Sequence, residues 1–294
     1  MDIFEPISMV TRLYWCIIFV VIIVANIETR MTRNIMSLSE QETRFLTTFS
    51  ASGKKIIQFN QAVEYFGSRA TAKNTMARLA RKNWLQRLDR GLYLIIPLEA
   101  GPERTWSENA FIIGSKLVSP GAVAYWSALR FWNMTEQLPQ VQFIQTLKRK
   151  KTVIIQGTEY RFITVRAHHF FGVIQRNLEG LPISVTDREK TILDAAARPD
   201  LSGGIIQLAA LLKTNADSID WEKLDRYLVQ WGGGVVVKRI GYLIQALSIP
   251  LPNGAEKLSR WQSMISKGIS LLEPGLEPKG PVMTRWQLQI NVKI

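Results

Sequence analysis

The stretch from Ser68 to Pro97 most constrains how this chain can fold, because a basic helix passes directly into a tight hairpin. Ala72, Met76 and Leu79 recur at helical spacing and predict one apolar face of a helix. About half a turn away, the same helix carries a polar and cationic face. That face consists of Asn74, Ala77, Arg78 and Arg81.

The hairpin is predicted by two alternating runs, residues 84–88 and residues 92–96. Between them stands Asp89-Arg90-Gly91, where glycine permits the positive φ that a tight turn needs. A basic helix followed at once by a hairpin is typical of a winged helix-turn-helix. The sequence therefore predicts that fold for residues 37–97.

Two earlier helices complete this predicted unit. Ser39 and Glu42 have the spacing of a capping box at a helix start, and the apolar stripe that follows includes Phe45. A second helix is expected over residues 61–66, and Ser68 is well placed to cap the third. Three helices and a hairpin fit within about sixty residues.

Charge is concentrated in the same part of the chain. Lys and Arg number 37 against 24 Asp and Glu, which gives a net charge of +13. Residues 39–97 hold ten of the basic and four of the acidic residues, and so contribute +6. A basic surface alone fits many proteins, but a basic face on a candidate recognition helix favours a polyanionic partner such as double-stranded DNA.

Residues 1–36 form a hydrophobic N-terminal extension. The apolar run from Leu13 to Ala25 is shorter than the roughly 20 residues of a membrane-spanning helix. Because Met36 directly precedes the first capping box, we expect translation to begin there and the extension to lie outside the native protein. A single-pass anchor is the alternative, and a signal peptide fits less well. The one cysteine, Cys16, excludes a disulfide framework, so we expect a cytoplasmic protein.

Residues 98–105 have the composition of a linker, and a larger domain is expected over residues 106–294. The pattern predicts an α+β fold for the whole chain, with a small antiparallel sheet in this larger domain. A second capping box is expected at Thr186 and Glu189. The expected helices are 106–118, 122–132, 205–213, 221–231 and 235–247, and the expected strands are 140–147, 152–156, 160–165 and 285–294.

In a helix-turn-helix the third helix enters the major groove, where Arg can pair with guanine and Asn with adenine. We therefore expect Asn74, Arg78 and Arg81 to contact base edges. Other side chains of the helix and hairpin are expected to contact phosphate, which fixes register without reading sequence. These are Thr71, Lys73, Lys82, Arg87 and Arg90.

Two other motifs have simpler interpretations. Lys148-Arg149-Lys150-Lys151 is expected to form a solvated turn of a hairpin, although contact with flanking DNA is an alternative. His168-His169 is the only histidine pair. Because neighbours on an extended chain point to opposite faces, we expect no metal site there.

Clustered carboxylates raise the possibility of an enzyme. Asp187, Glu189 and Asp194 share one predicted helix, but the first two are explained by helix capping and the helix dipole. No phosphate-binding loop, nucleophile elbow or dinucleotide fingerprint occurs. We expect no cofactor and no enzymatic activity. The alternatives are an enzyme that acts on nucleic acids or nucleotides with the carboxylates of the C-terminal domain, and a winged-helix adaptor that binds other proteins.

Several separated motifs resemble the AbiEi-type antitoxins and transcriptional regulators of type IV toxin-antitoxin systems. They are ARLARKNWLQRLDRGLYLIIPLE, SPGAVAYWSALRFWNMTEQLP, DREKTILDAAARPDLSGG and KRIGYLIQAL. The resemblance spans roughly Met36 to Ile294. It implies a winged-helix domain that represses its own operon, with two copies on inverted repeats, and a C-terminal domain that opposes a nucleotidyltransferase-like toxin of abortive infection. Stable contact with that toxin is not implied.

Overall fold

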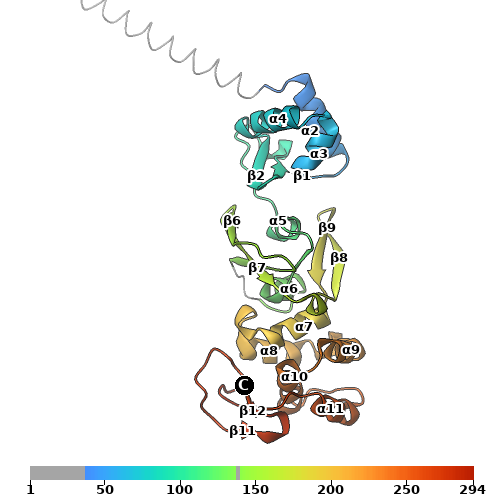
Figure 1. The fold of residues 1–294 in the computed structure, drawn as a ribbon, viewed down its shortest axis with the longest axis vertical. Helices are drawn as coiled ribbons and strands as arrows, with labels where there is room; N and C mark the ends of the chain where they lie inside the picture. The colour runs from blue at the N-terminus through green and yellow to red at the C-terminus, as the bar shows by residue number, and fades with distance from the viewer. Residues whose placement is uncertain (1–36, 137–139) are drawn as a thin grey trace, which may run out of the picture. The chain divides into compact units, whose positions relative to one another are not determined.

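The computed structural model describes residues 37–136 and 140–294. The predicted hydrophobic N-terminal extension, residues 1–36, lies outside the described residues. The chain divides into two compact units, with the boundary between Trp106 and Ser107. Both units combine helices with sheets, so the fold is mixed α+β (Figure 1).

Residues 37–106 of the first unit form three α-helices, one short 3₁₀ helix (Leu98–Ala100) and one small sheet. Its strands follow the order β1-β3-β2, and both pairings are antiparallel. The elements in chain order are α2 (Glu40–Ala51), β1 (Ile56–Gln58), α3 (Phe59–Phe66), α4 (Arg69–Arg81), β2 (Leu85–Asp89) and β3 (Leu92–Ile95).

The predicted capping box of α2 is confirmed. Ser39 Oγ accepts a hydrogen bond from the Glu42 backbone N–H at 3.3 Å, and Glu42 Oε2 accepts one from the Ser39 N–H at 2.8 Å. Phe45 is completely buried and stacks on Phe66 of α3, with ring centroids 4.9 Å apart. The same core receives the apolar face of α4, so the three helices share one hydrophobic cluster.

The second unit contains a six-stranded sheet of order β6-β7-β5-β4-β9-β8. The pairs β5/β7 and β4/β9 are parallel, whereas the other three are antiparallel. The expected small antiparallel sheet is therefore wrong in size and pairing. The strands are β4 (Gly121–Val123), β5 (Val141–Thr146), β6 (Val153–Ile155), β7 (Thr158–Thr164), β8 (Val173–Leu178) and β9 (Leu181–Thr186).

Helices of the second unit pack around this sheet and around one another (Figure 1). The helices α5 (Ala110–Lys116) and α6 (Tyr125–Phe131) contact the sheet, and α7 to α11 share a large apolar core with Trp286. Those helices are α7 (Arg188–Ala197), α8 (Gly204–Thr214), α9 (Trp221–Trp231), α10 (Val235–Ala246) and α11 (Gly254–Ser263).

A third, three-stranded sheet lies near the end of the chain. Its order is β10-β12-β11, from β10 (Ser270–Leu271), β11 (Val282–Met283) and β12 (Leu288–Gln289). The closing strand expected over 285–294 is thus only two residues long, because Thr284–Trp286 form a 3₁₀ turn. Within residues 37–136 and 140–294, no helix is long and apolar enough to cross a membrane.

Candidate nucleic-acid interface

The helix α4 begins as its sequence predicts. Ser68 has an extended backbone, and its hydroxyl accepts a hydrogen bond from the Thr71 N–H at 3.3 Å, which satisfies one free amide of the first turn. Ala72, Met76 and Leu79 are buried, and Thr75 is buried beside them. Thr71 itself is half-buried at this end of the helix.

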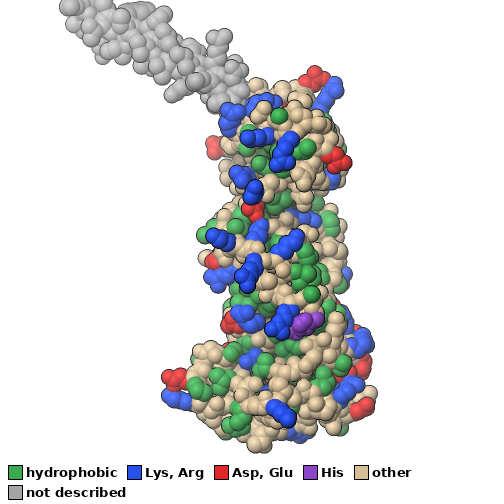
Figure 2. All heavy atoms as spheres, in the orientation of Figure 1, with side chains coloured by type: hydrophobic (Ala, Val, Ile, Leu, Met, Phe, Trp, Pro, Cys, Tyr) green, Lys and Arg blue, Asp and Glu red, His purple; other side chains and the backbone are tan. Residues whose placement is uncertain are grey.

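The opposite face of α4 is open to solvent. Lys73, Asn74, Ala77 and Arg81 are exposed at helical spacing. In the described part of the chain no Asp or Glu forms an ion pair with Lys73 or Arg81. Lys and Arg side chains are visible on the drawn face of the first unit (Figure 2). This face combines free cations with an amide, which is the chemistry of base-edge and phosphate contacts.

Arg78 of α4 and Lys82, the C-cap residue of this helix, contact a buried carboxylate on α2. Glu42 is completely buried, Lys82 Nζ lies 2.7 Å from its Oε2, and Arg78 Nε lies 3.1 Å from its Oε1. Lys82 also donates to the carbonyl oxygen of Ser37 at 2.7 Å. The Arg78 side chain keeps 42% of its surface exposed, whereas Lys82 keeps 17%.

These contacts set the ionisation of Glu42. Burial would raise its pKa, but hydrogen bonds from Lys82, the Ser39 N–H and Arg78 outweigh it and lower the pKa from 4.5 to about 2. The carboxylate is therefore ionised at neutral pH and compensated by two cations. It couples α2 to α4 with charge-assisted hydrogen bonds.

The hairpin follows α4 after a short turn. Gly91 adopts a φ of 73°, and the Asp89 carboxylate accepts a hydrogen bond from the Arg90 N–H at 2.7 Å. The carbonyl of Gly91 also accepts one from the Phe59 N–H at 2.8 Å, which ties the hairpin tip to the start of α3. Arg87 and Arg90 are exposed, and Arg87 Nε contacts the Asp89 carbonyl at 3.3 Å.

Of the eight predicted contact residues, five are thus exposed on α4 or the hairpin. Thr71 is half-buried, and Arg78 and Lys82 are half-buried against Glu42. The sequence pattern predicts Glu42 only as a capping partner, and its ion pairs with Arg78 and Lys82 are not predicted. The apolar residues around Glu42 place its side chain on the packed face of α2, and that pattern could have indicated a buried acid needing a cation.

The basic run in the second unit is not the expected hairpin turn. Residues 148–151 connect β5 to β6, and these two strands are not neighbours in the sheet. Lys148 Nζ donates to the carbonyl of Ser119, and Lys150 Nζ donates to the carbonyl of Leu117. Two of the four cations therefore satisfy carbonyls that follow α5.

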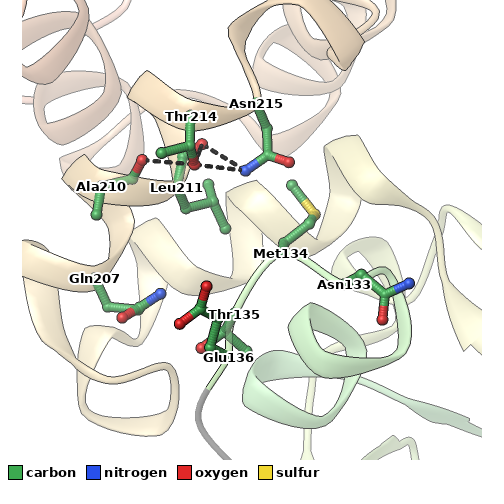
Figure 3. Close-up of a pocket in the computed structure, with 9 residues that line it drawn as sticks. All are labelled: Asn133, Met134, Thr135, Glu136, Gln207, Ala210, Leu211, Thr214 and Asn215. Atoms are coloured by element: carbon green, nitrogen blue, oxygen red, sulfur yellow. Dashed lines mark hydrogen bonds between the residues drawn. The ribbon is translucent and has the colours of Figure 1, made fainter.

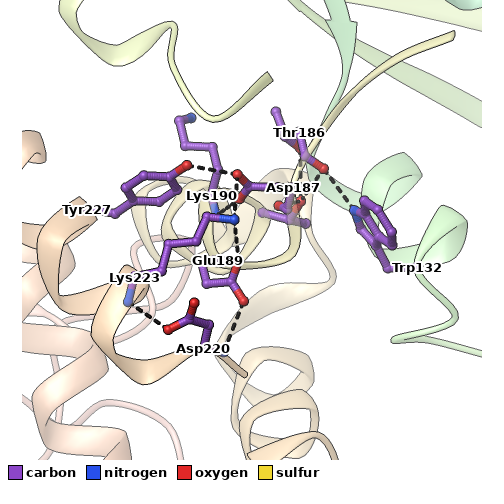
Figure 4. Close-up of polar contacts among 9 residues, drawn as sticks. Trp132, Thr186, Asp187, Glu189, Lys190, Asp220, Lys223 and Tyr227 are labelled. Atoms are coloured by element: carbon purple, nitrogen blue, oxygen red, sulfur yellow. Dashed lines mark hydrogen bonds and ion pairs between the residues drawn. The ribbon is translucent and has the colours of Figure 1, made fainter. Parts of the chain in front are cut away.

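The carboxylates of α7 form internal contacts (Figure 4). The helix begins one residue later than expected, because Asp187 is its N-cap and accepts from the Lys190 N–H at 2.9 Å. Asp187 also accepts from Tyr227 Oη at 2.8 Å, and Lys223 Nζ lies 3.0 Å from it. Glu189 accepts from the Asp220 N–H at 3.1 Å and pairs with the same Lys223. These acids join α7 to α9.

One further ion pair lies deeper in this unit. Lys190 and Asp194, four residues apart on α7, are both completely buried and contact each other. The Lys190 ammonium also lies 5.2 Å from the ring centroids of Phe171 and of Trp231. Asp194 accepts a second hydrogen bond from Gln145 Nε2 at 3.3 Å. The pair is a packed internal contact between helix and sheet.

The two histidines do not lie on an extended chain. Ala167–His169 form a 3₁₀ turn, so their rings lie 4.1 Å apart rather than on opposite faces. His169 stacks on Trp231 with a centroid distance of 3.9 Å. Burial, with nearby positive charge, lowers the pKa of His169. Among residues 37–136 and 140–294, no group of three His, Cys, Asp or Glu could hold a metal ion.

A surface pocket of about 450 Å³ lies in the second unit (Figure 3). Amide, hydroxyl and methyl groups dominate its lining, and Glu136 is the one charged side chain among the described residues that line it. The Thr214 hydroxyl donates to the carbonyl of Ala210, and Asn215 Nδ2 donates to the Thr214 hydroxyl. The pocket residues are Asn133, Met134, Thr135, Glu136, Gln207, Ala210, Leu211, Thr214 and Asn215.

Comparison with known proteins finds a likeness in fold. No protein-family model matches the chain. The structure is similar to the crystal structure of the RV2827C protein from Mycobacterium tuberculosis, with a TM-score of 0.58. The match covers 86% of this chain and 92% of that chain, at 14% sequence identity. The two proteins therefore share a fold over most of their lengths.

Proposed function

We propose that residues 37–97 form a winged helix-turn-helix that binds double-stranded DNA, with α4 in the major groove. The observation that carries this proposal is the exposed face of α4, where Lys73, Asn74 and Arg81 stand together without an acidic partner among the described residues. Element order supports it, because the third helix is followed directly by a two-stranded hairpin.

The residues divide by the contact each would make. Asn74 and Arg81 are exposed donors suited to base edges, and Arg78 reaches the same side with its free N–H groups. Lys73 on the helix and Arg87 and Arg90 on the hairpin suit phosphate oxygens. We assign Thr71, near the N-terminus of α4, a phosphate contact of the same kind, although it is half-buried.

The proposal is tested with DNA from upstream of the protein's own reading frame. Footprinting identifies the protected site, and fluorescence anisotropy then measures affinity for Arg81→Ala. We expect that variant to bind about 5- to 100-fold more weakly, as loss of one base-reading arginine predicts. Arg226→Ala removes an exposed arginine from the second unit and is the matched control. Equal affinity of the two variants would contradict the assigned face.

We propose further that the protein represses its own operon and acts as a type IV antitoxin, with two copies on inverted repeats. The sequence resemblance to AbiEi-type regulators supports this role. Its test is co-expression with a nucleotidyltransferase-like protein that is encoded by a neighbouring gene. The full chain should relieve growth arrest by that protein, and Arg81→Ala should lose repression while it still relieves arrest. If the full chain does not relieve growth arrest, the antitoxin role is contradicted and only the role as a transcriptional regulator remains proposed.

The two alternative functions receive less support. An enzyme would draw on the carboxylates of α7, but Asp187 and Glu189 contact Lys223, and Asp194 contacts Lys190. A protein adaptor would leave the exposed cations of α4 merely solvated. Footprinting that finds no protected DNA would favour the adaptor over the repressor.

A further inference from the structure

We propose that Glu42 determines which cations of α4 reach DNA, because it holds Arg78 in one orientation and withholds Lys82 from phosphate. The inference rests on the DNA binding proposed above. It makes Glu42 a positioning residue, although it lies on a different helix and is itself completely buried. The buried Glu42 on α2 would thus decide which cations the exposed face of α4 presents to the operator.

The contacts of Arg78 fix its guanidinium group at two nitrogens. Its Nε donates to Glu42 Oε1 at 3.1 Å, and its Nη2 donates to the hydroxyl of the buried Thr75 at 3.2 Å. The side chain nevertheless remains 42% exposed. The end of the guanidinium group is thus presented with its rotamers already restricted, which lowers the entropic cost of a base contact.

The contacts of Lys82 have the opposite consequence. Its ammonium lies 2.7 Å from Glu42 Oε2 and 2.7 Å from the Ser37 carbonyl oxygen, and only 17% of the side chain is exposed. Moving this ammonium to a phosphate would leave a completely buried carboxylate with one cation fewer. Removing one partner of such a buried pair is costly, so Lys82 stays with Glu42 when DNA binds.

The first experiment compares Glu42→Gln with Glu40→Gln in the full chain. Both variants remove one negative charge from α2, but Glu40 is 79% exposed, and among the described residues it pairs only with the exposed Arg44. Affinities for the footprinted operator and for a random duplex are measured across a salt series. Glu42→Gln should bind random DNA more tightly, with a log–log salt slope steeper by about one as Lys82 becomes free. Its operator-to-random affinity ratio should fall about 5- to 10-fold.

The second experiment keeps Glu42 and removes one cation at a time, either the exposed Lys73 or the Lys82 that contacts Glu42. Lys73→Met should make the salt slope shallower by about one, because an exposed phosphate contact is lost. Lys82→Met should leave the slope unchanged, although it removes the same charge. This pair decides the matter if Glu42→Gln fails to fold, as judged by circular dichroism.

Two outcomes would overturn the inference while leaving DNA binding intact. One is a slope for Glu42→Gln equal to that of Glu40→Gln, and the other is a slope for Lys82→Met that falls as far as that of Lys73→Met. Wild-type protein that binds no DNA would overturn the proposed function as well. The two failures are therefore distinguishable.

Discussion

The ionisation of Glu42 has a consequence for stability as well as for the DNA binding proposed above. Its pKa falls from 4.5 to about 2 on folding, because donors from Lys82, Ser39 and Arg78 outweigh the opposing effect of burial. A carboxylate whose pKa is depressed by folding stabilises the native state above its unfolded pKa. That stabilisation is fully present above pH 4.5 and is lost as the pH falls towards 2.

We expect Glu42→Gln to remove most of this acid sensitivity from the first unit. At neutral pH the variant should lose about 2 to 3 kcal/mol of stability, and the difference from wild type should shrink as the pH falls through the window from about 4.5 to 2. Chemical denaturation at a series of pH values, followed by circular dichroism, measures it. Glu40→Gln should track wild type, since that ion pair is exposed. A constant deficit at every pH would rule out the linkage.

A second residue-scale constraint lies in the motif KRIGYLIQAL. Gly241 on α10 faces the completely buried Trp286, and a Cβ built on this glycine would lie 2.3 Å from the indole ring. Trp286 Nε1 also donates to Gln245 Oε1 at 2.9 Å, one turn further along the helix. The glycine is therefore required by close approach and not by a positive φ.

Gly241→Ala should destabilise the second unit by about 1 to 3 kcal/mol, the usual cost of overpacking a core. Gly275→Ala is the matched control, because nothing lies within 4 Å of a Cβ at that position and its φ is not positive. Thermal unfolding of the full chain measures both. If the two variants unfold at the same temperature, the Trp286 indole leaves room for a side chain at position 241.

At the scale of elements, α4 depends on its first turn. Ser68 supplies the only side-chain cap of this helix in the described structure. Ser68→Ala should cost about 1 kcal/mol, and because α4 is the proposed recognition helix, hydrogen exchange in its first turn should accelerate. Ser50→Ala, an exposed position inside α2, should change neither quantity. Unchanged exchange in residues 69–73 would show that the cap contributes nothing.

The elements also differ in how far local sequence determines them. The predicted helix from Trp221 to Trp231 matches α9, because its apolar spacing and its Asp220 cap are local signals. The hairpin of β8 and β9 was missed, since Gln175, Arg176 and Asn177 are all exposed and polar on an edge strand. Alternation is weak there, and tertiary pairing with β4 decides the outcome.

Long-range partners explain the other differences. Because β5 pairs in parallel with β7, β6 lies on the far side of β7 and does not pair with β5. No residue in the connection from 147 to 152 indicates that strand order. The contacts of Glu42 with Arg78 span 36 positions, so neither helix alone reveals them. Similarly, Arg239 on α10 donates to the carbonyls of Ala196 and Leu272, although its own helix pattern predicts only a basic surface residue.

At the scale of the molecule, each unit has its own hydrophobic core. The cluster around Phe45 and Leu79 draws its residues from positions 38 to 95, and the clusters around Leu193 and Val185 lie beyond Trp106. Carbonyls and amides of the first sheet are likewise paired within the first unit. A unit with a closed core and paired strands has what it needs to fold alone.

We therefore expect a protein of residues 37–106 to fold without the rest of the chain. Domains of this size bury only about 60% of their unfolded surface, so the stability should be modest and a cooperative melt should be seen by circular dichroism.

The fragment should also bind the operator with the salt slope of the full chain, because the proposed phosphate contacts all lie within it. The fragment carrying Arg81→Ala is the control for specific binding. A folded fragment with a shallower slope would mean that cations of the second unit also contact DNA, and the run at residues 148–151, where Arg149 and Lys151 are exposed, would be the first place to look.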